Sequence, residues 1–157
     1  RFITDKMPFN FRLIGLIKVI LPKAKVIHCM RNPMDNCLSV FKNRFSRANH
    51  YAYNLRELGQ FYYHYLDLMN HWRKTIPHFI YDISYEALVS DQEKQTRKLL
   101  NHCQFPWEES CLSFHKTERP IATSSYTQVR RPMYRDSINL WMKYERQLES
   151  LKKVFNQ

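Results

Sequence analysis

Residues 25–39 read KVIHCMRNPMDNCLS, and this stretch predicts a buried strand, a turn and the start of a helix. The apolar run Val26–Met30 is typical of a strand that is covered on both faces. Asn32 is a suitable N-cap, and Pro33 suits the first turn of a helix. Arg31 is therefore expected at the carboxyl end of a strand, beside a helix N-terminus.

An anion site is expected at that position. Ligands of open α/β sheets bind at the carboxyl ends of the strands, and a helix N-terminus favours anions. Arg31 can fork onto phosphate oxygens, and Ser39, two helical turns later, can add a hydroxyl donor. Alternatively, the arginine is a solvated surface charge and the serine bonds to its own helix. Asp35 shares the helix face of Ser39 and would repel a phosphate unless it caps the helix.

The composition is that of a globular domain with a cationic surface. The chain has 157 residues, 44% of them apolar and 15% aromatic, which is enough for one domain with one core. It has only two glycines, and neither a Walker loop nor a GxGxxG motif is present. The net charge of +11 attracts nucleotides, acidic peptides or sulfated glycans. Because the basic residues are spread along the chain, nucleic acid is not the expected partner.

The cysteines, the apolar runs and the histidines indicate the redox compartment, the absence of a membrane span and the absence of a metal site. The four cysteines have no CxxC spacing, which favours free thiols and a reducing compartment. The apolar run Leu13–Leu21 contains Lys18 and is too short to span a membrane. His64 and His71 have no cysteine or carboxylate at metal-ligand spacing, so no metal is expected.

The remaining pattern alternates strands with helices. We expect strands at 1–6, 26–30 and 78–83, and helices at 9–21, 32–44, 54–76, 90–103 and 136–155, with a short helix after residue 107. This order predicts an α/β domain with a parallel sheet and helices on both faces. If the first two strands are parallel, Lys6 lies at the same edge as Arg31. The hydroxyl-rich stretch 122–132 predicts a functional or disordered loop.

Several segments, taken in order, resemble one family. Arg31-x-x-x-Asp35-x-x-x-Ser39 after a strand resembles the 3'-phosphate-binding segment of sulfotransferases that use 3'-phosphoadenosine 5'-phosphosulfate (PAPS). Asp5-Lys6-x-Pro8-Phe9 is similar to a segment of tyrosylprotein sulfotransferases and of bacterial sulfotransferase domains that are fused to tetratricopeptide repeats. Segments 99–107, 125–132 and 134–145 resemble the same families.

The resemblance implies a P-loop-NTPase-like layered domain, of which residues 1–157 are the C-terminal portion, with the N-terminal part absent. It implies transfer of a sulfuryl group from PAPS to an acceptor hydroxyl, on a tyrosine of an acidic peptide or on a sugar or small molecule. The 5'-phosphosulfate loop and the catalytic base would precede Arg1. The alternative is therefore a non-catalytic nucleotide- or anion-binding fragment. An upstream tetratricopeptide-repeat segment or a second chain is a possible partner.

The resemblance also implies residue roles. Arg31 and Ser39 would hold the 3'-phosphate, Tyr85 the adenine, Arg130 or Arg131 the nucleotide phosphates, and Lys6 and Ser125 the reacting sulfate, without a metal. Asn43 replaces an arginine of the tyrosylprotein enzymes, so a third phosphate contact falls to Lys42 or Arg44. The resemblance to the bacterial domains implies that the protein is located in the cytoplasm, whereas the resemblance to the tyrosylprotein enzymes implies the Golgi lumen. The cysteines, which are expected to be free thiols, favour the cytoplasm.

Overall fold

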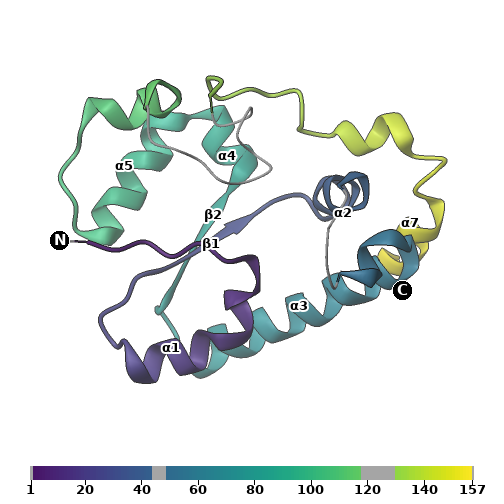
Figure 1. Ribbon diagram of the computed structural model, residues 1–157, viewed down its shortest axis with the longest axis horizontal. Coiled ribbons are helices and arrows are strands. Elements are labelled where there is room, and N and C mark those ends of the chain that lie inside the picture. Colours follow the sequence, from purple (N-terminus) through teal and green to yellow (C-terminus); the bar gives the residue numbers. More distant parts are fainter. Residues whose placement is uncertain (1, 44–48, 118–129, 157) are drawn as a thin grey trace.

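The computed structural model describes residues 2–43, 49–117 and 130–156, and a parallel pair of strands lies at its centre (Figure 1). Strands β1 (Val26–Met30) and β2 (Ile80–Ser84) pair in a register that places Met30 opposite Ser84. Parallel strands end at the same edge of a sheet. Arg31 and Tyr85, the next residue after each strand, are therefore neighbours.

Helices cover both faces of this sheet. On one face, His28 of β1 contacts Tyr65 of helix α3 (Leu55–Thr75). On the other face, the ring of Tyr81 stacks on His102 of helix α5 (Gln92–Cys103), with 4.6 Å between centroids. Successive residues of a strand point to opposite faces, which explains this division. The described part of the chain is thus an α/β structure, as predicted.

The remaining elements are short. They are the 3₁₀ helices η1 (Pro8–Leu13), η2 (His50–Tyr53), η3 (Glu109–Lys116) and η4 (Leu140–Tyr144), and the α-helices α1 (Ile14–Ile20), α2 (Pro33–Lys42), α4 (Tyr85–Ser90) and α7 (Glu149–Phe155). Two predicted N-caps are confirmed, because Asn32 and Asn54 each accept two backbone N–H groups at the start of α2 and α3.

Four sequence-based expectations are wrong. Strand β1 is not buried on both faces, because none of its residues is fully buried and Cys29 is exposed. No strand forms at residues 2–6, since this segment pairs with neither β1 nor β2. The N-cap of α5 is Asp91 rather than Ser90, and Ser84 caps the unexpected α4. The stretch 136–155 is not one helix, because Asn139 adopts left-handed backbone angles (φ 57°) and the chain divides into η4 and α7.

The largest buried cluster lies where α2, α3 and α7 meet, and it includes Cys37, Leu38, Leu58, Tyr62, Leu148 and Leu151. Gly59 of α3 permits the close approach of α7, since a Cβ there would lie 3.0 Å from a methyl carbon of Val154. All four cysteines are free thiols. None of the helices within the described ranges is long and apolar enough to cross a membrane.

Asp35 connects this cluster to the C-terminal segment. It is the one buried charged residue among those described, with 1% of its surface exposed. Its carboxylate accepts the backbone N–H of Asn139 at 2.7 Å and that of Trp141 at 2.9 Å. The charge of Asp35 is therefore compensated by backbone donors from another segment, which answers the concern that it would repel an anion near Ser39.

We expect Asp35→Ala to lower the free energy of unfolding by about 2–4 kcal/mol, because two partly buried N–H groups lose the buried carboxylate that accepts them. Urea denaturation measures the change. Asp67→Ala is the control, since Asp67 is exposed on α3, and it should change stability by less than about 0.5 kcal/mol. Equal losses in the two variants would contradict this assignment.

Candidate functional site

Arg31 occupies the carboxyl edge of the sheet, where it is half-buried. Its guanidinium carbon lies 5.2 Å from the centroid of the Tyr85 ring, and its Nη2 donates to the carbonyl oxygen of Ser137. Its Nε is buried and has no hydrogen-bond partner within the described residues. Buried donors rarely remain unpaired, so this Nε is a candidate donor to a bound anion.

Glu86 holds the turn that presents Arg31. Its carboxylate accepts the backbone N–H of Asn32 at 2.7 Å and the hydroxyl of Ser84 at 2.8 Å. Burial raises the pKa of Glu86, but these hydrogen bonds and the charge of Arg31 outweigh burial and keep the pKa below its ordinary value. The carboxylate therefore stays ionised and ties the end of β1 to the end of β2. Glu86 was not among the predicted site residues, although it follows a strand end and forms a Tyr-Glu pair with Tyr85 that resembles the family.

Tyr85 connects Arg31 to the C-terminal segment. Its hydroxyl donates to the carbonyl oxygen of Tyr134 at 3.4 Å. Burial raises the pKa of Tyr85, and a hydrogen bond with the Ser137 side chain and the charge of Arg31 offset part of that rise. The guanidinium of Arg131 lies 5.0 Å from the centroid of the Tyr134 ring. Three predicted site residues, Arg31, Tyr85 and Arg131, thus gather around residues 134–137.

The other predicted residues lie elsewhere or outside the described part. Lys6 is exposed and close enough to Cys29 to lower the pKa of that thiol, which burial raises more strongly. Ser39 is half-buried on α2, and its carbonyl accepts the Asn43 side chain. Among the described residues, no hydrogen bond joins Lys6 or Ser39 to Arg31. Arg130 directly precedes Arg131 and is half-buried. Ser125 lies outside the described residues.

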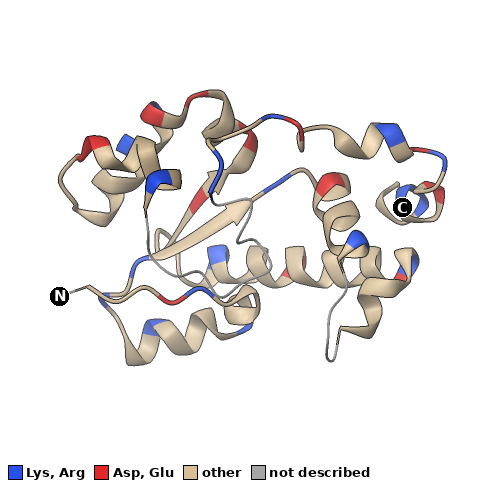
Figure 2. Cartoon of the chain, turned by 45° about the horizontal axis from the view of Figure 1, so that its top comes forward, with Lys and Arg blue, Asp and Glu red and all other residues tan. Residues whose placement is uncertain are grey.

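The structure does not distinguish between Lys42 and Arg44 as the third phosphate contact. Arg44 lies outside the described residues, and the ammonium of Lys42 lies 5.5 Å from the centroid of the Tyr144 ring. Figure 2 shows lysines and arginines distributed over most elements, with a basic position directly after β1. Within the described ranges, no group of three or more histidine, cysteine or acidic residues could hold a metal ion.

Comparison with known proteins links these residues to one family. A family model described as "Sulfotransferase family" matches residues 1–109, which include Arg31 and Tyr85. An "Uncharacterized protein" from Aquifex aeolicus (strain VF5) is 40% identical over 150 residues, which cover 93% of this chain and 20% of that relative. The chain therefore spans about a fifth of the length of the relative it matches.

The lowered pKa of Glu86 predicts a pH-dependent contribution to stability. A carboxylate whose pKa is depressed on folding stabilises the protein above its unfolded pKa, and this contribution is lost as the pH falls. We expect Glu86→Gln to be less stable than wild type at pH 7, and the difference to shrink between about pH 5 and pH 3. Urea titrations at several pH values measure it. Glu57→Gln, at an exposed position of α3, is the control; a constant deficit in Glu86→Gln would contradict the assignment.

Proposed function

The chain belongs to the sulfotransferase family, and we propose that it binds PAPS and contributes to transfer of the sulfuryl group to an acceptor hydroxyl. The single observation that carries the proposal is Arg31. It follows a half-buried strand at the carboxyl edge of the sheet, beside an aromatic ring, and its buried Nε has no hydrogen-bond partner within the described residues. This arrangement suits a phosphate with a nucleobase nearby.

We propose that Arg31 and four further residues bind the nucleotide half of PAPS. In this proposal Arg31 and Ser39 hold the 3'-phosphate, the Tyr85 ring packs on the adenine, and Arg131, with or without Arg130, binds the remaining phosphate. Two observations support it. Tyr85 lies beside both Arg31 and residue 134, against which Arg131 packs. The carboxylates of Asp35 and Glu86 are already occupied by hydrogen-bond donors, so they do not compete for the guanidinium.

PAPS would supply the sulfuryl group, and positioning with charge stabilisation would account for most of the catalysis. We propose Lys6 and Ser125 as the residues that act on the reacting sulfate. This part of the proposal rests on the sequence motifs at 5–9 and 125–132 alone. No metal ion has a role in it, because the cationic side chains are assigned to the developing charge.

The fold family, the acceptor, the cellular compartment and a neighbouring segment are also part of the proposal. We propose that the sheet belongs to a P-loop-NTPase-like parallel sheet, in keeping with helices on both faces and a cationic carboxyl edge. The net charge of +11 favours a tyrosine in an acidic peptide as acceptor. A sugar or small-molecule hydroxyl is the alternative. The free thiols favour the cytoplasm over the Golgi lumen, and a tetratricopeptide-repeat segment is the proposed neighbour.

Calorimetric titration with adenosine 3',5'-bisphosphate tests the nucleotide site. We expect saturable binding, much weaker binding of 5'-AMP, and a loss of about 10- to 100-fold in affinity in Arg31→Ala, which removes a charged hydrogen-bond donor. Arg56→Ala is the matched control, since Arg56 is exposed at the start of α3. Equal affinity for the two nucleotides, or equal loss in the two variants, would refute the 3'-phosphate site.

Transfer is tested with PAPS that carries radioactive sulfate, offered with an acidic tyrosine peptide and, separately, with sugar acceptors. Sulfation of the peptide that falls in Lys6→Ala, with bisphosphate affinity unchanged, supports the catalytic proposal. Bisphosphate binding without transfer to any acceptor favours the non-catalytic alternative.

A further inference from the structure

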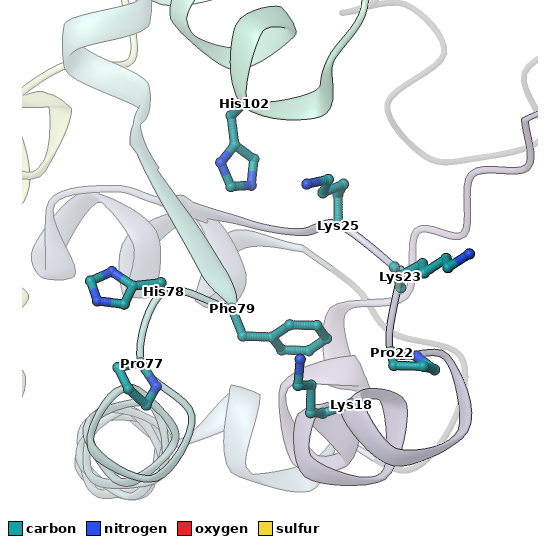
Figure 3. A pocket seen from close by; sticks show the side chains of 9 residues that line it. Lys18, Pro22, Lys23, Lys25, Pro77, His78, Phe79 and His102 are labelled. Carbon is teal, nitrogen blue, oxygen red and sulfur yellow. The ribbon is translucent and has the colours of Figure 1, made fainter.

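A cationic cavity lies at the opposite edge of the sheet from Arg31. Its volume is about 330 Å³, and it opens between the loop that enters β1, the loop that enters β2 and the end of α5 (Figure 3). The residues that line it are Lys18, Pro22, Lys23, Ala24, Lys25, Pro77, His78, Phe79 and His102. The cavity therefore belongs to the amino ends of the parallel strands, and the proposed nucleotide site to their carboxyl ends.

The charge of this cavity is uncompensated. Three lysines and two histidines line it, and its described lining contains no aspartate or glutamate. The ion pairs of the described residues involve none of the three lysines. Ammonium groups around one small cavity repel one another, and a bound anion relieves that repulsion.

Two aromatic contacts fix the cavity wall. The Nζ of Lys18 lies 4.6 Å from the centroid of the Phe79 ring, a cation–π distance that restricts the ammonium. His102 stacks on Tyr81, and its buried Nε2 has no hydrogen-bond partner within the described residues. Figure 3 shows the Lys25 side chain on the same side of the cavity as His102. Charged and hydrogen-bonding groups are thus held around one space.

We propose that this cavity binds a phosphate group, as inorganic phosphate or as the phosphate of a small monoester. A dianion suits a lining that carries several cations, and lysine ammonium groups bind phosphate as point charges. The volume is at the lower end of the range for small-molecule sites, which suits a small phosphorylated compound. The site is separate from the proposed nucleotide site and does not depend on it.

Titration of the full chain with inorganic phosphate and with glycerol 3-phosphate tests this proposal. Calorimetry measures affinity, and acetylation followed by mass spectrometry measures which lysines the ligand protects. We expect saturable binding that protects Lys18 and Lys25. Lys25→Ala should lose about tenfold or more in affinity, because a charged hydrogen-bond donor is removed, whereas Lys25→Arg should retain most of it. Tighter binding of the monoester would identify it as the ligand type, and equal binding would identify phosphate alone.

Two controls separate this site from other cationic surfaces. Lys143→Ala removes an exposed lysine from the C-terminal segment and should bind phosphate as wild type does. Arg31→Ala should also bind phosphate in the cavity as wild type does. The cavity proposal can therefore be confirmed even if the proposed nucleotide site is refuted. Binding that does not saturate, protection spread evenly over all lysines, or equal loss in Lys25→Ala and Lys143→Ala would overturn the proposal. Circular dichroism establishes that each variant is folded.

Discussion

The bidentate ion pair between Asp82 and Arg73 fixes the two strands and the long helix relative to one another. Nε and Nη2 of Arg73, on α3, donate to the two carboxylate oxygens of Asp82, on β2, at 3.0 and 2.9 Å. The same carboxylate accepts His28 of β1, whose other ring nitrogen bonds to Tyr65 of α3. Burial raises the pKa of Asp82, but the hydrogen bonds and charges of its partners lower the pKa by more than burial raises it. The pKa therefore lies below its ordinary value and the carboxylate stays charged. Because this network lies in the middle of the strands, it also sets which residues meet at their ends.

The carboxyl edge then depends on carboxylates that act as connectors. Glu86 joins the turn after β1 to the end of β2, and Asp35 joins α2 to the segment around Asn139. Each uses its oxygens on backbone or hydroxyl donors. Arg31 follows β1, donates from one nitrogen to a carbonyl oxygen and pairs with no carboxylate among the described residues. The edge therefore remains attractive to an anion although two acidic residues help to build it.

The features that were predicted correctly from the sequence depend on residues that are neighbours in the chain. The strand at 26–30 and the caps at Asn32 and Asn54 follow from neighbouring residues, and the strand ends place Arg31 and Tyr85 at one edge. The predictions that were wrong failed because of contacts between residues that are far apart in the sequence. The helical pattern of 136–155 is overridden where Asn139 turns to donate its N–H to Asp35, a contact that no local pattern announces. Glu86 was missed for the same reason, since its partner Asn32, the N-cap of α2, is 54 residues away in the sequence.

The two cationic edges are close in sequence but electrostatically separate. A strand of five residues at about 3.3 Å per residue puts roughly 15 Å between its ends. The Debye length at physiological ionic strength is about 8 Å, so exposed charges at the two edges interact weakly through solvent. Coupling through the protein would require the strands themselves to shift, and the Asp82 network opposes such a shift because it ties both strands to α3. Anions at the two edges are therefore expected to bind independently, with the sheet as a rigid spacer between them.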